Sequence, residues 1–214
     1  MLADIQKLTD ILAIDAEGRF SPEDRAAAIE LALFRYSSDR PRIAKETAEF
    51  KGLPVLSLPQ DWQADFSRVL DVRTDGGARV DFDVSGEKIV INGFVKAGEK
   101  IVITYTLPHV LTETQDTIPF VDREAVANWA AAFLLDGMAA GYAGAIAATI
   151  SSDSVEHGSK ANNYHAQAAA CRKFYRDHMG LDDKRNAAAG TTVVVKRSGT
   201  SGRMGIVNRR RNDD

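Results

Sequence analysis

The sequence predicts an α+β fold that is mainly α: a bundle of two short and two long helices with a small antiparallel β-insert and an extended C-terminal arm. Three observations predict it. Apolar residues recur at helical spacing on both sides of a central region, and that region consists of short alternating runs separated by turn residues. The residues from 181 onward are rich in Gly, Ser, Thr and Arg. We therefore expect a helical body formed by 1–42 and 120–180, a β-rich insert at 43–119 and an arm at 181–214.

The composition is that of an ordinary globular protein. The chain has 214 residues, of which 44% are hydrophobic and 27% charged, which excludes a wholly disordered chain or a collagen-like fibre. The single Cys171 cannot form an intramolecular disulfide. The Ala- and Gly-rich stretch 125–150 is too weakly hydrophobic to span a bilayer, and the N-terminal residues lack the features of a signal peptide. We expect a soluble, intracellular protein with no membrane contact.

Two short helices are predicted at the N-terminus. Leu2, Ile5 and Leu8 begin an apolar pattern at helical spacing over 2–16, and Gly18 ends it. Ser21 is a typical N-cap residue, and Pro22 suits the first position of a second helix. This helix should continue to about 35–37, and its inward residues should be Ile29, Leu33 and Tyr36.

The central region predicts short strands. Pro54 and Pro59 interrupt a stretch that we expect to be extended or irregular. Four alternating or β-branched runs follow, separated by Gly-containing turns that favour hairpins. These runs are 68–73, 79–84, 88–93 and 100–107.

Two long helices are predicted after Pro119. Asp122 is placed to cap the first, over 123–149, and the Ser-rich residues 151–154 should end it. The second should occupy 159–178, with one face formed by Tyr164, Ala168, Cys171 and either Phe174 or Tyr175. The position of Cys171 on this apolar face predicts a buried core thiol.

Charge is distributed unevenly along the chain. Residues 181–214 contain eight Lys and Arg against four Asp, a net charge of +4, and the other residues carry 19 basic against 26 acidic side chains, a net charge of −7. The β-branched run in the arm is suited to adding a strand to a sheet edge, and its arginines to pairing with acidic groups. The predicted partner-binding residues are Thr191, Thr192, Val193, Val194, Val195, Lys196, Arg197, Arg203, Arg209, Arg210 and Arg211. The edge could belong to a partner, to a neighbouring subunit or to the chain's own β-insert.

The sequence shows no catalytic, cofactor-binding or metal-binding pattern. Asp153, Glu156 and His157 lie close together, but His165 and His178 are 13 residues apart, a spacing that does not place two ligands on one turn of a helix. The Gly-rich segment 199–205 lacks the Gly-Lys-Ser/Thr ending of a phosphate-binding loop. We expect a protein that is not an enzyme and that needs no cofactor.

Three stretches together resemble the head–tail connectors of tailed phages, the adaptor, head-completion or neck proteins that dock beneath the portal ring. The first is the strand ending in Tyr105-Thr106-Leu107-Pro108-His109, followed by Asp116-Thr117-Ile118-Pro119. The second is the Ala-rich helix that starts at Asp122 and continues to Ala143, and the third runs from Asp153 through Tyr164 to Gly180. The order of the elements also matches over 1–180.

The resemblance implies a structural virion protein at the neck, present in the host cytoplasm during assembly. Such connectors form an oligomeric ring, usually of twelve subunits, between the portal protein and a stopper or tail-completion protein. They line the channel through which the genomic DNA passes, without specific binding. On this reading, the two long helices form the lateral ring contacts and the β-insert faces a second partner or the neighbouring subunit.

Two other functions are compatible with the sequence. The basic arm fits a nucleic-acid-binding accessory protein, although it lacks the aromatic residues of a single-strand site. A small enzyme has only the histidine cluster around His157 in its favour.

Overall fold

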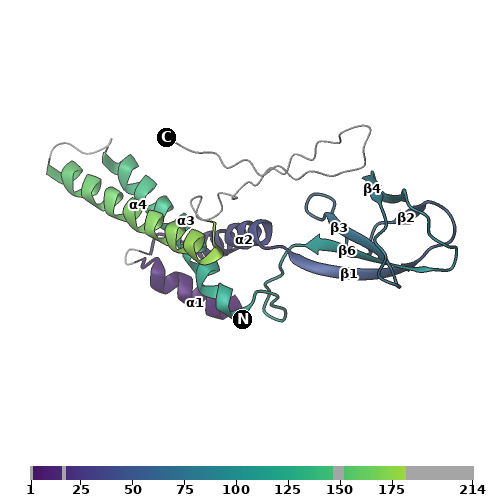
Figure 1. Ribbon diagram of the computed structural model, residues 1–214. Helices are drawn as coiled ribbons and strands as arrows, with labels where there is room; N and C mark the ends of the chain where they lie inside the picture. Colours follow the sequence, from purple (N-terminus) through teal and green to yellow (C-terminus); the bar gives the residue numbers. More distant parts are fainter. Residues whose placement is uncertain (1, 16–17, 147–151, 182–214) are drawn as a thin grey trace, which may run out of the picture. The chain divides into compact units, whose positions relative to one another are not determined.

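The computed structural model of the protein describes residues 2–15, 18–146 and 152–181 (Figure 1). Four α-helices and two three-stranded antiparallel sheets make up this part, so the fold is α+β and mainly α, as predicted. The helices come from both ends of the described chain, and the strands from its middle.

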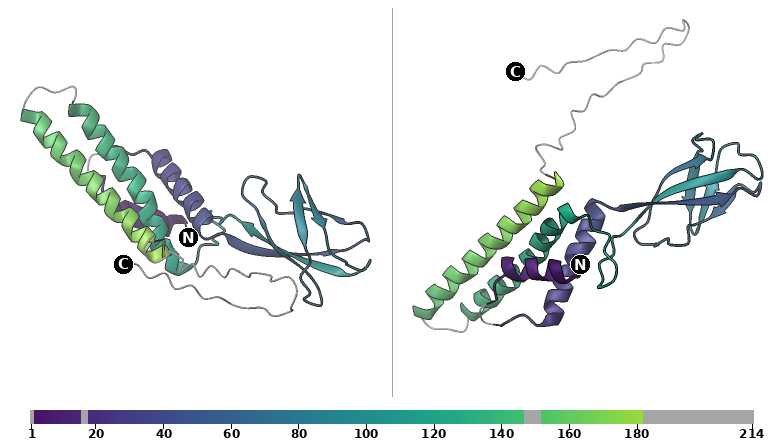
Figure 2. Two further views of the ribbon diagram at one scale, coloured as in Figure 1. Left: turned by 45° about the horizontal axis from the view of Figure 1, so that its top comes forward. Right: turned by 90° about the horizontal axis from the view of Figure 1, so that it is seen from below.

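The helical body is organised around α3 (Arg123–Ile146), which packs against α1 (Leu2–Leu12), α2 (Pro22–Asp39) and α4 (Ser152–Met179). The α3–α4 pair has the most extensive contact, and the two helices lie side by side in both views of Figure 2. Small side chains allow this close approach. Five alanines of α3 are fully buried: Ala125, Ala127, Ala130, Ala131 and Ala132.

The start of α2 follows the sequence prediction in detail. The Ser21 hydroxyl accepts a hydrogen bond from the Asp24 N–H at 3.1 Å, and the Asp24 carboxylate accepts one from the Ser21 N–H at 3.0 Å. This reciprocal pair is a capping box, with Pro22 in the first turn. Ile29 and Tyr36 are buried as expected, and Leu33 is half-buried.

Two helix boundaries differ from the prediction. The first helix ends at Leu12, not near residue 16, because the Asp15 carboxylate accepts hydrogen bonds from the N–H groups of Arg19 and Phe20 and so stabilises a turn. The last helix begins at Ser152, seven residues before the predicted start, so 152–154 lie in this helix and not in the expected break. Ser and Asp favour the first turn of a helix as well as loops, and the sequence alone does not separate the two.

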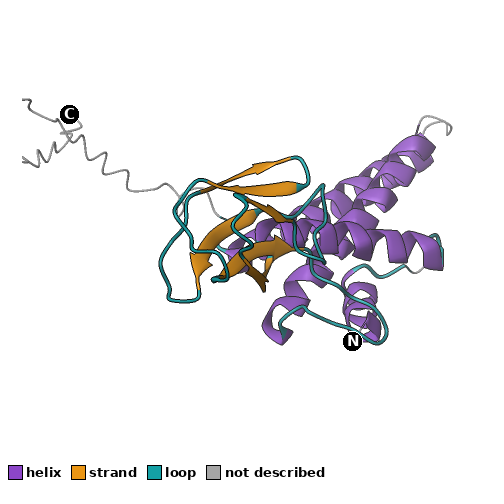
Figure 3. Cartoon of the chain, turned by 90° about the vertical axis from the view of Figure 1, so that its right-hand side faces the viewer, coloured by secondary structure: helices purple, strands orange, loops and turns teal. Residues whose placement is uncertain are grey.

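The strands form two sheets (Figure 3). In the first, the strand order is β1 (Arg42–Glu49), β6 (Lys100–Leu107) and β3 (Val69–Thr74). In the second, the order is β2 (Val55–Ser57), β5 (Lys88–Ile91) and β4 (Phe82–Ser85). A shared apolar core joins them, and it includes Val72, Ile89, Ile91, Ile101, Ile103, Tyr105 and Leu107.

The strand prediction is right in type but incomplete. β1 and β2 occupy the stretch expected to be extended or irregular, and β1 pairs with β6 along its whole length. The run predicted at 79–84 forms a strand only from Phe82, and Arg79 makes an isolated bridge to Arg73. The predictions for 68–73, 88–93 and 100–107 place β3, β5 and β6 to within two residues.

Candidate interaction surfaces

A buried carboxylate joins three segments of the helical body. Asp122, in the short 3-10 helix Phe120–Asp122 before α3, has a side chain that is 1% exposed. It accepts hydrogen bonds from the Tyr36 hydroxyl at 2.6 Å, from Arg40 Nη1 at 2.8 Å and from His178 Nε2 at 2.8 Å. The sequence predicts Asp122 as a helix cap, and it does precede α3 directly. Its side chain instead fastens the ends of α2 and α4 to the start of α3.

The electrostatics of this cluster favour the ionised carboxylate. Burial alone would raise the pKa of Asp122, but the hydrogen bonds from Tyr36, His178 and Arg40 outweigh it and hold the pKa below its ordinary value. Burial, together with the hydrogen bond to Asp122, raises the pKa of Tyr36. The hydrogen bond to Asp122 also raises the pKa of Arg40. Asp122 and Arg40 therefore form a pair that stays charged.

A second contact fixes the last turns of α4. The Tyr175 hydroxyl donates to Asp39 Oδ2 at 2.8 Å, and Arg35 Nε binds the same oxygen at 2.7 Å. The Tyr175 ring is fully buried and lies 4.7 Å, centroid to centroid, from the ring of Trp129. The end of α4, from which the arm leaves, is thus held against α2 and α3.

His109 ties the chain after β6 to the end of α2. Its backbone N–H donates to Ser37 Oγ at 2.9 Å. In the ring, Nδ1 lies 2.9 Å from the Thr117 carbonyl oxygen and Nε2 lies 3.0 Å from the Arg40 carbonyl oxygen. The ring also packs against Tyr36. These contacts give His109 a structural role where the β-rich insert meets α2.

Large apolar side chains are exposed on the helical body. On α2, Leu31 is 51% and Phe34 67% exposed, and they are three positions apart, so they lie on one side of the helix. Leu31 also lines a groove of about 440 Å³ between α2 and α3. The other apolar residues that line this groove include Phe20, Ala27, Phe133, Leu134 and Met138. An apolar groove with exposed apolar side chains at its rim is typical of a protein-binding surface.

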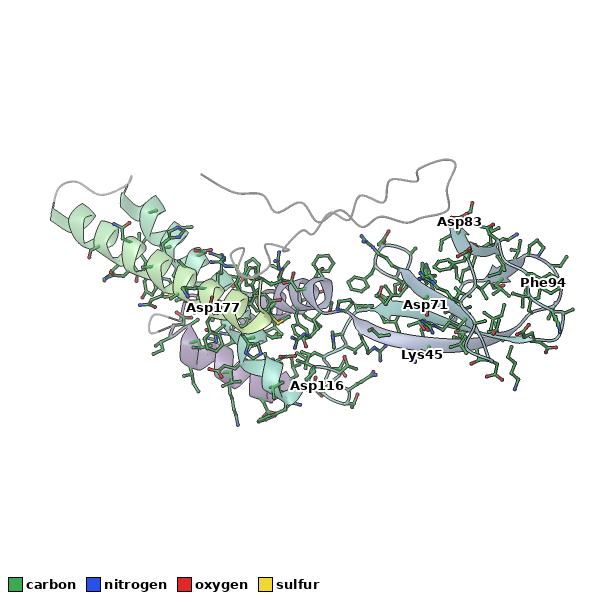
Figure 4. The ribbon with its side chains drawn as sticks, viewed as in Figure 1. Lys45, Asp71, Asp83, Phe94, Asp116 and Asp177 are labelled. Carbon is green, nitrogen blue, oxygen red and sulfur yellow. The ribbon has the colours of Figure 1, made fainter. Side chains whose placement is uncertain are left out.

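The β-rich insert has its own exposed apolar side chains. Phe94, labelled in Figure 4, is 90% exposed in the loop between β5 and β6. Leu53 is 69% exposed in the loop between β1 and β2. The two loops are in contact, since a Cβ at Gly52 would lie 3.4 Å from that of Ala97. They form a second candidate interaction surface.

All the partner-binding residues predicted in the arm, from Thr191 to Arg211, lie outside the described residues. The side chains of Asp153, Glu156 and His157 are likewise outside the described part of the chain.

The other candidate reactive groups have structural partners. His165 contacts Asp136 at 3.1 Å, and Asp136 also pairs with Arg172. Cys171 is only half-buried, so the prediction of a buried core thiol is wrong in degree; burial still raises the pKa of its thiol. Among the described side chains, no group of three or more His, Cys, Asp or Glu is arranged to hold a metal ion.

Sequence reasoning did not identify the cluster of Tyr36, Arg40, Asp122 and His178. These residues come from three distant parts of the chain, since only Tyr36 and Arg40 are near each other in sequence, and no spacing rule connects the three parts. The one local signal was the position of Asp122 just before a helix, which equally predicts an ordinary cap.

No protein-family model and no curated protein matches the chain. Within the described residues, no helix is long and apolar enough to cross a membrane.

Proposed function

We propose that the protein is a structural head–tail connector of a tailed phage. It docks as a ring on the portal protein, links the portal to a stopper or tail-completion protein and lines the DNA channel at the virion neck. It is not an enzyme. The observation that carries the proposal is the order of elements: two short helices, a β-insert and two long helices that pack through an Ala-rich interface.

The exposed surfaces support this proposal. A subunit that contacts neighbours on several sides needs apolar side chains outside its own core. Leu31 and Phe34 on α2, and Phe94 and Leu53 on the β-rich insert, are of this kind. The net charge of −7 outside the arm suits a channel wall that does not hold DNA, because cations dominate non-specific binding to phosphates.

The test is the mass of the protein mixed with its cognate portal ring. The full chain is compared with a chain that ends at Gly180. We expect a complex with a ring stoichiometry for the full chain, and a weaker one or none without the arm, because its basic residues are suited to acidic portal surface. Failure of both chains to bind any portal ring would contradict the connector function.

The basic arm favours a second candidate, a nucleic-acid-binding accessory protein. Lys196, Arg197 and Arg209–Arg211 supply cations that would neutralise DNA phosphates. This function predicts DNA binding that weakens steeply with salt and disappears when 184–211 is removed. A connector that does not bind DNA should show no such binding, either as the full chain or after removal of 184–211.

A further inference from the structure

The first sheet leaves one long edge open. β1 pairs with β6 over all eight of its residues, and no described strand pairs with its other side. The residues after β3 already occupy its outer side. The Thr74 N–H donates to the Ala78 carbonyl oxygen, and the Val80 N–H donates to the Val72 carbonyl oxygen. The edges of the second sheet, β2 and β4, are only three and four residues long. Such an unpaired edge is a template for an added strand.

The charged side chains of β1 are distributed unevenly along the strand, basic at its start and acidic at its end. Its first half carries Arg42 and Lys45, and its second half carries Glu46 and Glu49. Lys45, labelled on β1 in Figure 4, shares the exposed face of the strand with Ile43, Thr47 and Glu49. A strand with an uncharged start and a basic end complements this edge only when it runs parallel to β1. An antiparallel strand would place its cations beside Arg42 and Lys45, where like charges destabilise the pairing.

The arm contains a segment with this pattern. Thr191–Lys196 consists of five β-branched residues followed by a lysine, and Arg197 comes next. In a parallel register that pairs Ile43 with Thr191 and Thr47 with Val195, Arg197 lies opposite Glu49. Lys196 is then the diagonal neighbour of Glu46, within reach of a long side chain.

We propose that the open edge of β1 accepts Thr191–Lys196 of a second copy of the chain as a parallel added strand. This inference rests on the proposed function, and it assigns the added strand to the interface between neighbouring subunits. The contacts of Tyr175 and His178 fix the end of α4, and the nine residues 182–190 that follow can span at most about 30 Å. An arm from one subunit that binds an edge on the next is a heterologous contact, the type that closes a ring.

The experiment crosslinks two different single-cysteine proteins in the presence of the portal ring. Full-length chains carrying Cys171→Ser with either Thr47→Cys or Val195→Cys are mixed and treated with a short bismaleimide. We expect a covalent dimer of the two chains. The matched control replaces Thr47→Cys with Val84→Cys, on exposed β4, and should give only background.

Charge reversal tests the register. Glu49→Arg should weaken assembly about two- to fivefold, the size expected for a cross-strand ion pair, and Arg197→Glu in the same chain should restore it. No restoration would overturn the parallel register.

The outcomes separate this contact from the function on which it rests. A portal complex of normal mass with no crosslink above the Val84→Cys control overturns the strand contact and leaves the connector function intact. A chain with both Thr47→Cys and Val195→Cys that crosslinks only within itself overturns the second copy as the source of the strand. Loss of every portal complex for the unmodified chain contradicts the connector function itself.

Discussion

At the scale of single residues, the carboxylate of Asp122 should be the most costly charged group to alter in the helical body. It is 1% exposed and receives hydrogen bonds from Tyr36, Arg40 and His178. Asp122→Asn removes the charge and leaves at least one buried donor without its acceptor. We expect a loss of about 2–4 kcal/mol in the free energy of unfolding, measured by urea denaturation at pH 7. Asp71→Asn, at a more exposed ion pair on β3, should cost much less than Asp122→Asn.

The same residue predicts a dependence on pH. The pKa of Asp122 is lower in the folded protein than its ordinary value of 3.8, so the unfolded chain binds the proton more readily. The stabilisation is therefore fully present above pH 3.8 and is lost as the pH falls through the folded-state value. The difference in unfolding free energy between the wild type and Asp122→Asn should shrink over this acid range. A difference that stays constant down to pH 2 would contradict the assignment.

Interactions between residues that are close in the sequence could be predicted from it, and interactions between residues that are far apart could not. Ser21 and Asp24 are three residues apart, and the prediction of Ser21 as a cap is confirmed by the capping box. The partners of Asp122 lie 56 to 86 residues away. Their meeting depends on how the helices pack, and no single-sequence pattern records it.

At the scale of elements, the end of α4 should be held in place by Tyr175. Tyr175→Phe keeps the ring against Trp129 but removes the hydroxyl that binds Asp39 at 2.8 Å. We expect a loss of about 1 kcal/mol and faster amide hydrogen exchange in the last two turns of α4. Arg176→Lys, at an exposed position next to Tyr175, serves as the control and should leave exchange unchanged. Equal effects of the two substitutions would mean that the hydroxyl does not anchor the helix.

Among the strands, those with strong apolar alternation were predicted, and β1, with weak alternation, was expected only as an extended or irregular stretch. β6 alternates clearly, with Ile101, Ile103 and Tyr105 buried, and its bounds are as predicted. β1 has Ala44, Glu46 and Ala48 on its inner face, so its alternation carries little apolar contrast. It is a strand because β6 pairs with it along its whole length, and that tertiary contact is not visible in the local sequence.

At the scale of the whole molecule, assembly should depend on apolar surface that the single chain leaves open. The double substitution Leu31→Ser and Phe34→Ser changes side chains that are 51% and 67% exposed, so the free energy of unfolding should change by less than about 1 kcal/mol. If the face of α2 beside the α2–α3 groove contacts a partner, loss of two large apolar groups should weaken binding to the portal ring by at least tenfold.

The measurement is the mass of the portal complex across a concentration series, with urea denaturation of each variant alone. Val84→Ser, at an exposed position on β4, is the control for a general change in surface polarity. Selective weakening by the α2 variant would assign this face to assembly, because its fold and its charge are unchanged. If the α2 variant binds as the wild type does, the exposed apolar residues of α2 take no part in the ring. The lateral contacts must then come from the α3–α4 pair or from the edge of β1.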